Sequence, residues 1–565
     1  MVDDFSSVSV GQYLALRLRE VGVAHLFGLP GDFNLSLLDE MLSDTGLEWV
    51  GSTNELNAAY TADAYARVRR SLGALVTTYG VGELSAINGI AGSYAEDVPV
   101  VQITGATSTQ ASTARALLHH TLVDGDHGHF ERVYREVTAR TEILRVDSAA
   151  QQIDKALITA IRESKPVYIS VPTDVAVATI DGSNLRWPLP APQSDQVMLQ
   201  RFRETVKERL ASVAQVTVLA GPRLHRRGLE AALRSLAETP GIHVASQSGS
   251  KAILDETHPR SLGTYMGRIT RSQVVREMVD TASPVVLAGV VLSDLLTGFF
   301  SHEFDVDGAI ALDLVEARVG GARFYGVLLE DALQALQEVV SELGLNDQPT
   351  ETSHFGVEPV EAGTGSLTQA EFWSAVQDWL PAGTTVVADA GTSFYGALEL
   401  AMPADTDLLG QAVWSSIGYT LPATLGASLG DPSKRVALFI GDGSAQLTIQ
   451  ELATILHRGL TPVVFLINNA GYTVERAIQS PNATYQDVTS WDWLAFPRAF
   501  GAENAAVTLQ ASTGEELLAA LEVAAKHTDT LVLIEVLMDR MDTPTILAEL
   551  AAGLATANAT RSYPA

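Results

Sequence analysis

The strongest constraint on the fold is a pair of apolar runs that each end in small polar residues. The run 435–440 reads Arg-Val-Ala-Leu-Phe-Ile and ends at 441–444, Gly-Asp-Gly-Ser, while the run 462–467 ends at Asn468-Asn469. Short β-branched and apolar runs stopped by glycine are typical of buried parallel strands. A helical pattern separates the two runs, and strand–helix–strand units cross over right-handed. Both polar ends are therefore expected at one carboxyl edge of a parallel sheet, where ligands collect.

The segment between the two runs has the pattern of a single helix. Ser444 is expected to cap its start, because a serine side chain accepts a hydrogen bond from a free amide of the first turn. Apolar side chains then recur at i, i+3, i+4 and i+7, on one helical face: Ile449, Leu452, Ala453 and Leu456. Gly459 is expected to end the helix.

The polar ends offer ligands for a metal ion and for phosphate. Asp442, the amide oxygen of Asn469 and a backbone carbonyl such as that of Gly471 are hard oxygen donors, which favour Mg²⁺ or Ca²⁺ over Zn²⁺. Free amides at the helix start favour phosphate. The pattern indicates a metal–diphosphate cofactor. The alternative is a Gly-Asp-Gly turn that only ends a strand, with an Asn-Asn turn nearby.

Length and composition exclude several classes of protein. A chain of 565 residues is expected to form three or four domains, and 46% hydrophobic with 18% charged residues is ordinary for a large, well-buried enzyme. The net charge of −30 disfavours nucleic acid and an anionic membrane surface as partners. The chain has no cysteine, which excludes disulfides, thiolate metal sites and a cysteine nucleophile.

The amino terminus and the most apolar stretch favour a soluble, cytoplasmic protein. The segment Met1-Val2-Asp3-Asp4 is acidic and lacks the pattern of a signal peptide. The stretch 282–300 is the nearest approach to a membrane span, but it contains Pro284, Gly289, Asp294 and Gly298. We expect it to form a buried strand and a loop.

Two expected linkers divide the chain into three blocks. Residues 184–196 carry three prolines, and 346–366 are polar with scattered proline and glycine. We expect an α/β fold with three doubly wound parallel-sheet domains, at 1–183, 197–345 and 367–565. The expected strands are 75–78, 98–104 and 166–171 in the first block, 216–220, 285–289 and 309–312 in the second, and 385–389, 436–440, 462–467 and 531–536 in the third.

Two weaker patterns concern the architecture. The sequence Val-Pro-Val-Val at 98–101 resembles Thr-Pro-Val-Val at 461–464, a faint hint that the first and third blocks share one architecture. In the middle block, Gly221-Pro222-Arg223 follows a strand and can approach a nucleotide, but no G-x-G-x-x-G pattern accompanies it. We therefore expect the middle domain to be structural.

The first and third blocks contain side chains suited to proton transfer. In the first block these are Asp32, Glu55 and the pair His119-His120. Each also has a simpler interpretation: Asp32 as a turn residue, Glu55 as an acid in the first turn of a helix, and the histidines as surface residues. In the third block, Glu475 follows a candidate metal ligand by six residues and is expected near the site.

Together these segments resemble one family over nearly the whole chain. The chain is similar to the thiamine-diphosphate-dependent 2-oxo acid decarboxylases, which include pyruvate, indolepyruvate and branched-chain keto acid decarboxylases. The motifs that carry the resemblance are Gly28-Leu29-Pro30-Gly31-Asp32-Phe33-Asn34, Asn54 to Tyr60, Leu118 to Thr121, Gly391-Thr392-Ser393-Phe394, Ser416-Ile417-Gly418, Gly441 to Ser444 and Asn468 to Glu475.

The resemblance implies thiamine diphosphate and Mg²⁺ as cofactors, within the thiamine-diphosphate enzyme fold. The first domain is then expected to bind the aminopyrimidine and the third the diphosphate, with the cofactor between two chains. A dimer would be the minimal active unit, and tetramers are common. The implied metal ligands are Asp442, Asn469 and Gly471. The implied cofactor-binding residues are Glu55, Thr392, Ser415, Ser416, Ile417, Asp442, Gly443, Ser444, Asn469, Gly471 and Tyr472.

The resemblance also implies catalytic roles. Glu55 is expected to contact a pyrimidine nitrogen and to promote deprotonation of the thiazolium ring. Ile417 is expected to wedge beneath the cofactor and hold it folded. The expected proton-transfer set is Asp32, His119, His120 and Glu475. Packed carboxylates and imidazoles titrate as a group, so no single pKa belongs to one of them.

Three positions depart from the family pattern. Ser415 replaces the usual glycine of a Trp-Gly-Ser-Ile segment, which the backbone tolerates if its local dihedrals suit a side chain. His127 stands where many relatives have phenylalanine, and Gln479-Ser480 replaces a frequent His-Gly. The first departure concerns cofactor geometry, and the others concern the substrate side and a lid.

The substrate and the reaction have competing interpretations. Val474 stands where pyruvate-restricted members of the family often carry isoleucine and broader ones valine, and the segment 392–395 resembles the branched-chain and aromatic keto acid enzymes. The resemblance therefore implies a broad enzyme for branched or aromatic 2-oxo acids, with a pyruvate-preferring enzyme as the alternative. One methylene changes discrimination by only ~1–3 kcal/mol. The rivals are an acetolactate-synthase-type carboligase and a non-catalytic scaffold. The pair His119-His120 and Glu475 argue against both, since they supply the proton that yields an aldehyde.

Overall fold

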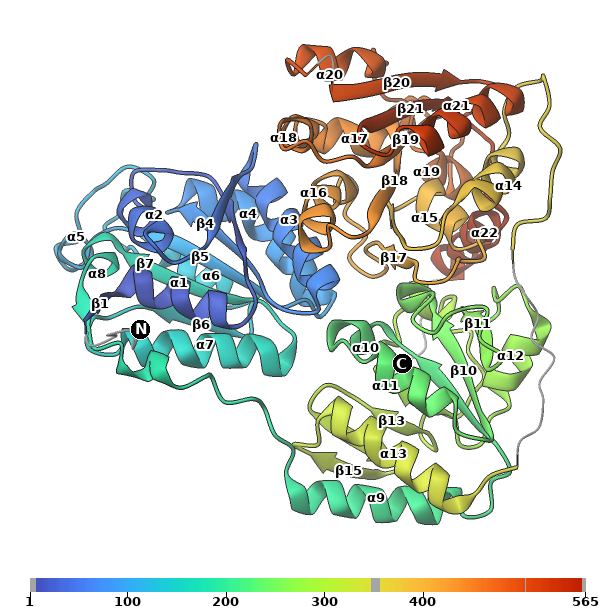
Figure 1. Cartoon of the computed structure of the whole chain (residues 1–565), viewed down its shortest axis with the longest axis horizontal. Coiled ribbons are helices and arrows are strands. Elements are labelled where there is room, and N and C mark those ends of the chain that lie inside the picture. The colour runs from blue at the N-terminus through green and yellow to red at the C-terminus, as the bar shows by residue number, and fades with distance from the viewer. Residues whose placement is uncertain (1–6, 347–355, 503–504, 561–565) are drawn as a thin grey trace. The chain divides into compact units, whose positions relative to one another are not determined.

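The structure is a computed structural model that describes residues 7–346, 356–502 and 505–560 (Figure 1). The chain divides into two compact units. The first contains the chain up to Pro192 together with Leu425–Pro432, and the second contains Gln193–Thr424 together with the chain from Ser433 onward. Part of the expected linker 346–366, at 347–355, lies outside the described residues, and 356–366 form neither helix nor strand.

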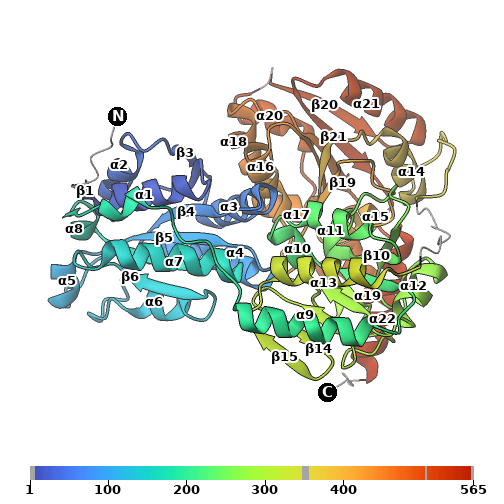
Figure 2. The ribbon, with the colours of Figure 1, turned by 60° about the horizontal axis from the view of Figure 1, so that its bottom comes forward.

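The first unit is built on a six-stranded parallel sheet with the order β3-β2-β4-β5-β7-β6. Its helices α1, α2 and α7 bury apolar stripes on one face, and α3 and α4 pack together against the other (Figure 2). The strands are β2 (His25–Gly28), β3 (Glu48–Gly51), β4 (Gly73–Thr78), β5 (Val100–Ala106), β6 (Arg140–Ile143) and β7 (Val167–Pro172); the large helices are α1 (Val10–Glu20), α2 (Leu35–Leu42), α3 (Glu55–Arg69), α4 (Val81–Ala95) and α7 (Ala149–Glu163).

Helix α7 illustrates why these helices form where they do. Its residues Ile153, Ala156, Leu157 and Ala160 follow the i, i+3, i+4, i+7 spacing, and all four are fully buried. The remaining elements of the unit are short: β1 (Val8–Ser9), which pairs antiparallel with β8 (Thr179–Ile180), α5 (Thr109–Thr113), α6 (His129–Tyr134), α8 (Thr173–Ala176) and the 3₁₀ turn η1 (Ser183–Arg186).

The second unit contains two sheets, the first of which has the order β11-β10-β9-β12-β13-β14-β15. Helices α9, α11 and α13 bury one face, and α12 buries the other. The elements are α9 (Gln196–Leu210), β9 (Val216–Ala220), α10 (Pro222–Arg226), α11 (Glu230–Ala237), β10 (Ile242–Gln247), η2 (Ser248–Ser250), β11 (Ser261–Tyr265), α12 (Gln273–Asp280), β12 (Val286–Ala288), η3 (Leu295–Thr297), β13 (Ile310–Leu312), β14 (Glu316–Val319), β15 (Ala322–Tyr325) and α13 (Leu329–Leu343).

This middle sheet is mixed rather than wholly parallel. Strands β13, β14 and β15 pair antiparallel, and the tight turn between the last two is Gly320-Gly321, with Gly320 at a φ of 53°. A glycine pair allows a short hairpin, a connection that parallel strands cannot use. Arg223, in the motif Gly221-Pro222-Arg223, donates to both carboxylate oxygens of Asp313 at 2.8 Å.

The other sheet of the second unit has the order β17-β16-β18-β19-β21-β20, and its assigned pairings are parallel. Phe439 of β18 and Phe465 of β19 stack at 4.7 Å beneath Phe372 of α14. The elements are α14 (Gln369–Trp379), β16 (Thr384–Ala388), α15 (Thr392–Ala397), β17 (Asp407–Leu409), α16 (Thr420–Gly430), β18 (Arg435–Gly441), α17 (Asp442–Thr448), α18 (Glu451–His457), β19 (Val463–Asn468), α19 (Thr473–Ile478), η4 (Thr484–Gln486), η5 (Trp493–Ala495), α20 (Phe496–Ala499), β20 (Ala506–Ala511), α21 (Gly514–Lys526), β21 (Leu531–Leu537) and α22 (Thr545–Thr560).

The sheets β2–β7 and β16–β21 share one topology. Numbered by chain order within each sheet, both run 2-1-3-4-6-5. The similar segments 98–101 and 461–464 lead into β5 and β19, the fourth strand of each sheet, so the hint in the sequence is confirmed. In each sheet the chain changes direction between its first and third strands, β2 and β4 or β16 and β18. Such switch points place ligands outside the carboxyl ends of the strands.

The expected α/β class with doubly wound sheets is confirmed. All ten expected strands are present to within two residues at either end. Short or edge strands were not expected, among them β3, β6, β17 and β20, because their sequences are brief or polar. The stretch 282–300 contains β12 and η3, as expected for a strand and a loop. Among the described residues, no helix is both long and apolar enough to cross a membrane.

Candidate active site

The turn after β18 is shaped by close packing. Gly441 is the N-cap of α17, which begins at Asp442, so the expectation that Ser444 caps this helix is wrong. Ser444 lies in the first turn instead, because the extended backbone already ends at Gly441. A Cβ on Gly443 would lie 2.5 Å from the ring of Tyr472, so only glycine fits. The expected single helix is also two helices, α17 and α18, broken at Ile449-Gln450.

Asp442 is buried at the edge where β18 and β19 end. Its side chain accepts hydrogen bonds from the backbone N–H of Gly443 at 2.8 Å and of Gly471 at 3.1 Å. Burial nevertheless raises the pKa of this carboxyl to about 6, because charge is costly away from water. A cation beside Asp442 would offset that cost.

Asn469 supplies a second oxygen at this edge. It is 4% exposed, and within the described residues its Oδ1 is buried without a hydrogen-bond partner. The neighbouring Asn468 differs, because its Nδ2 donates to Glu535 at 2.7 Å. Gly471 has a φ of 138°, and a Cβ there would lie 2.1 Å from the carbonyl oxygen of Gln486. A buried carboxylate and an orphaned amide oxygen on adjoining turns fit a hard divalent cation and the diphosphate that it accompanies.

The turn that carries Asn469 and Gly471 is held by Arg476, which the sequence did not single out. The Arg476 side chain is fully buried. One of its terminal nitrogens donates to the carbonyl of Ala470 at 3.1 Å, to that of Gln486 at 3.2 Å and to Asp487 at 2.6 Å. Its positive charge also acts to lower the pKa of Asp442. An arginine in an acidic helix start gives no clear signal in sequence alone.

The segments after β16 and before α16 lie against the same turn. Thr392 is buried at the first position of α15, and its N-cap Gly391 has a φ of 118°. The preceding Asp389, also missed by the sequence reasoning, accepts hydrogen bonds from the hydroxyl of Thr420 at 2.5 Å and from the N–H of Gly418 at 3.4 Å. A hydrogen bond from Ser444 acts on Asp389 as well, although burial still raises its pKa.

Residues Ser415, Ser416 and Ile417 form a half-exposed loop. The side-chain oxygen of Gln411 accepts from the N–H of Ser416 at 3.0 Å, and the Ser415 hydroxyl donates to the carbonyl of Gln411 at 3.2 Å. Ser415 has a φ of 52°, the left-handed region that glycine favours. A serine in this conformation costs roughly 1–2 kcal/mol relative to the right-handed region.

In the first unit, three of the expected catalytic residues meet. Ligand atoms of Asp32, His119 and His120 all lie within 4.8 Å of one another, and His119 Nε2 is 2.7 Å from an Asp32 oxygen. His119 stacks on Phe33 at 5.0 Å. Within the described residues, His120 Nδ1 is buried without a partner. Asp32 and His119 are more than half exposed, so the cluster is open to a ligand.

Glu55 lies at the same edge, at the first position of α3 after the N-cap Asn54. The turn Gly80-Val81-Gly82 lies close to both Glu55 and the backbone of His120. A Cβ on Gly82 would lie 3.1 Å from a Glu55 oxygen, and one on Gly80 would lie 2.0 Å from the carbonyl of His120. Both glycines let the turn approach these residues closely.

The turn is held by Glu83, a buried carboxylate that the sequence reasoning missed. Glu83 accepts from the N–H of Gly80 at 2.7 Å and from the hydroxyl of Tyr168 at 2.7 Å. Tyr134 donates to the Glu83 carbonyl at 2.6 Å. Burial raises the pKa of Glu83 to about 7. Its N-terminal helix position made it look like an ordinary first-turn acid.

His127 braces the segment that carries His119 and His120. Its Nε2 is 2.9 Å from the carbonyl of Ala116, so this nitrogen bears the proton and donates. Its Nδ1 is 2.8 Å from the hydroxyl of Thr107, which donates to it. A phenylalanine here would make neither bond.

Glu475, Tyr472 and Val474 follow the metal turn in the second unit. Glu475 is exposed in the first turn of α19, and Tyr472 is its N-cap residue. Val474 lies 3.8 Å from the position of a Cβ on Gly391. Phe394 and Tyr395 are buried in the core of this sheet.

Comparison with known proteins identifies the family. Three models of thiamine pyrophosphate enzymes match: the N-terminal binding domain at 8–130, the central domain at 203–339 and the C-terminal binding domain at 389–536. Curated proteins named alpha-keto-acid decarboxylase are similar over nearly their full length. The protein from Mycolicibacterium paratuberculosis is 41% identical over 546 residues, covering 96% of each chain, and that from Mycobacterium tuberculosis is 40% identical over 548 residues, covering 97% of each.

The chain belongs to the thiamine-diphosphate-dependent alpha-keto-acid decarboxylase family. The match over three domains agrees with the resemblance that the motifs indicated. The expected domain boundaries and the roles of individual site residues stay predictions.

Replacing Glu83 by glutamine is expected to flatten the dependence of stability on pH. The carboxyl of Glu83 has a pKa of 4.5 in the unfolded chain, and burial raises this pKa to about 7 in the fold. Between these values the unfolded state binds fewer protons, so stability falls as pH rises, by about 2.5 kcal/mol from pH 5 to pH 8. Glutamine has no such proton, so the melting temperature of Glu83→Gln should rise relative to the parent from pH 5 to pH 8.

Circular dichroism melts at the two pH values measure this difference. The exposed Glu522→Gln on α21 serves as the control. If the melting temperatures of the parent and of Glu83→Gln differ by the same amount at pH 5 and at pH 8, the expectation is wrong.

Asn469→Ala is expected to lose the stabilisation that Mg²⁺ and thiamine diphosphate give the protein. Ligand at a hundred times its dissociation constant stabilises a fold by about 2.7 kcal/mol, which a thermal melt detects. Removing the orphaned oxygen should reduce the shift by more than half. The matched control Asn468→Ala loses the bond to Glu535, so it should melt lower without ligand but keep its shift. Equal shifts in all three proteins would rule out Asn469 as a ligand.

Proposed function

We propose that this protein decarboxylates 2-oxo acids non-oxidatively, releasing an aldehyde and CO₂, with thiamine diphosphate and Mg²⁺ as cofactors. The observation that carries the proposal is the cluster of Asp32, His119 and His120, in which His119 contacts Asp32 at 2.7 Å. A carboxylate–imidazole pair can both hold and deliver a proton. Aldehyde formation requires such a delivery to the carbon that has lost CO₂.

The residues at the carboxyl edges of the sheets β2–β7 and β16–β21 have different proposed roles. When bound, thiamine diphosphate supplies the electron sink for the carbon–carbon bond that breaks. Asp442, Asn469 and the carbonyl of Gly471 would hold Mg²⁺, and Gly443, Ser444 and Thr392 would bind the diphosphate. Glu55 holds a proton at the aminopyrimidine. Ser415, Ser416 and Ile417 support the cofactor body, and Tyr472 closes the turn beside Gly443.

Proton transfer is assigned to Asp32, His119, His120 and Glu475. Asp32 accepts a hydrogen bond from Nε2 of His119 and so orients its ring. The Gly80–Gly82 turn fixes the backbone of His120 and the carboxylate of Glu55. Glu475 follows the metal turn directly and is exposed in the first turn of α19, which leaves its carboxylate available for proton transfer. We propose that two chains form each active site, as a homodimer or homotetramer in the cytoplasm.

The substrate range is proposed to be broad, with branched-chain and aromatic 2-oxo acids preferred and pyruvate also accepted. Val474 supports this range, because it lies beside Gly391 at the start of α15 and is one methylene smaller than isoleucine. An acetolactate-synthase-type carboligase is the second candidate. The proton-transfer cluster favours release of aldehyde over condensation.

A panel of 2-oxo acids tests the proposed reaction. Aldehyde should form from 3-methyl-2-oxobutanoate, phenylpyruvate and pyruvate only when Mg²⁺ and thiamine diphosphate are present. Glu475→Gln should retain the thermal shift with cofactor yet lose at least ~10²-fold in turnover, since a general acid–base contributes that much.

The exposed Glu522→Gln should keep full turnover. Undiminished aldehyde production by Glu475→Gln at saturating cofactor would remove Glu475 from the mechanism. A condensed hydroxyketone as the main product of the parent would favour the carboligase.

Val474→Ile is expected to narrow the substrate range. The added methylene occupies space near the start of α15, which should reduce kcat/KM for phenylpyruvate and 3-methyl-2-oxobutanoate by roughly 10-fold while pyruvate changes little. Val507→Ile in strand β20, a partly buried valine packed on the same core, is the control. An equal loss for all three substrates would mean that Val474 affects stability rather than selection.

A further inference from the structure

A second polar pocket lies in the second unit, beyond the carboxyl end of α15. Its lining comes from four places in the chain: Lys251 after η2, the segment 264–271 at and after β11, Leu398 and Glu399 after α15, and Ile546 at the start of α22. Thr392 is at the opposite end of α15, so the pocket is separate from the proposed diphosphate site. The cavity has a volume of about 30 Å³, which suits one carboxylate group.

One wall of the pocket has hydrogen-bond donors that the fold does not use fully. Lys251 is 2% exposed, and its ammonium forms an ion pair with Glu256 at 2.7 Å. An ammonium has three N–H donors, so this ion pair does not use all of them. Arg271 is one-third exposed, and among the described residues its only ion pair is with Glu399, at 3.9 Å. The Thr264 hydroxyl is buried without a partner among those residues. Unmet donors in a small cavity favour an acceptor-rich ligand.

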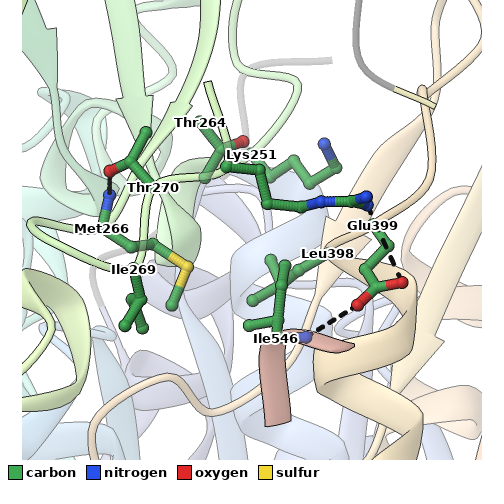
Figure 3. A pocket seen from close by; sticks show the side chains of 9 residues that line it. Lys251, Thr264, Met266, Ile269, Thr270, Leu398, Glu399 and Ile546 are labelled. Carbon is green, nitrogen blue, oxygen red and sulfur yellow. Dashed lines mark hydrogen bonds and ion pairs between the residues drawn. The ribbon is translucent and has the colours of Figure 1, made fainter. Parts of the chain in front are cut away.

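Glu399 does not satisfy these donors. One of its oxygens accepts from the N–H of Ile546 at 2.8 Å, which ties it to the start of α22 (Figure 3). Burial raises the pKa of Glu399, while the N–H of Ile546 and the charge of Arg271 act against that rise. The separation of 3.9 Å between Arg271 and Glu399 is too long for a hydrogen bond, so Glu399 does not use the guanidinium donors.

The remaining wall is apolar. Met266, Leu398 and Ile546 are each at most 4% exposed, and Ile269 is partly buried. Figure 3 shows these four side chains below Thr264 and Lys251, with Glu399 at one side. A ligand with a charged head and a short apolar chain would match both walls.

An adjoining recess gives the apolar chain somewhere to extend. It has a volume of about 200 Å³ and shares Arg271 and Glu399 with the pocket. Val357, Trp373 and Pro544 line it. Its acidic residue Asp542 is engaged, because it accepts from the N–H of Gln369 at 2.6 Å.

We propose that this pocket binds a small aliphatic carboxylate, whose head is held by Arg271, Lys251 and Thr264 and whose chain extends into the adjoining recess beside Val357 and Trp373. Arginine suits this role, since its planar fork matches a carboxylate. The proposal does not depend on the catalytic roles assigned above.

Binding of 2-methylpropanoate to the full-length protein, saturated with Mg²⁺ and thiamine diphosphate, tests the proposal. This probe has no oxo group and is not decarboxylated. Isothermal titration calorimetry at constant ionic strength should detect binding. Arg271→Gln should weaken it at least tenfold, and Thr264→Val, which keeps the side-chain shape, should weaken it severalfold.

Two matched controls distinguish binding in this pocket from binding elsewhere on the protein. Arg268→Gln removes an exposed arginine of the same loop and should leave the affinity unchanged. Asn469→Ala, compared with the parent when both proteins are free of cofactor, should also leave the affinity unchanged. Equal affinity of the parent and Arg271→Gln, loss of binding in Asn469→Ala, or no binding at all would each overturn the proposal.

A second arm identifies the source of the ligand. With cofactor-free full-length protein, 3-methyl-2-oxobutanoate is compared with 2-methylpropanoate on the parent and on Arg271→Gln. Tighter Arg271-dependent binding of the oxo acid would support the pocket as a site for the substrate class. Equal Arg271-dependent binding would support a site for aliphatic carboxylates in general. If either acid binds equally tightly to the parent and to Arg271→Gln, both interpretations are wrong.

Discussion

The candidate active site depends on the parallel alignment of β18 and β19. Their pairing places Gly441 opposite Ile467, so Asp442 and the turn at Asn469 follow at the same edge. Backbone N–H groups of Gly443 and Gly471 hold the Asp442 carboxylate, and within the described residues the Asn469 oxygen is left without a partner. Burying the Asp442 carboxylate and the Asn469 oxygen away from water costs free energy, and a bound cation would offset that cost.

The sheet of the first unit has the same topology but carries different side chains at its switch point. The equivalent switch point lies at β2 and β4, where Asp32 follows one strand and the Gly80–Gly82 turn follows the other. Instead of an orphaned oxygen it presents an open carboxylate–imidazole pair. Beneath it, Glu83 and Tyr168 form a buried polar layer that fixes the turn. One topology thus supports the proposed diphosphate site at the edge of one sheet and the proposed proton-transfer cluster at the edge of the other.

Sequence reasoning predicted those features that depend on local pattern. The central strands were found because each is a short apolar run, and the site motifs because they follow such runs directly. It failed where tertiary contacts decide. Ser444 was taken for a cap, although the extended backbone ends at Gly441, and the helix after it breaks at Ile449-Gln450. Asp389, Arg476 and Glu83 were missed because their importance lies in partners distant in sequence or in burial, which a single sequence does not display.

The hairpin β14–β15 has a consequence for self-association. An exposed parallel edge strand is a template for pairing with another molecule, and such pairing leads to open-ended aggregates. Here the outermost strand has only four residues, and it presents Arg323 and Tyr325 outward. Arg323 also forms an ion pair with Glu316 at 3.3 Å. The middle sheet thus ends at this side in a short strand with a charged side chain, which discourages the addition of a strand from another molecule.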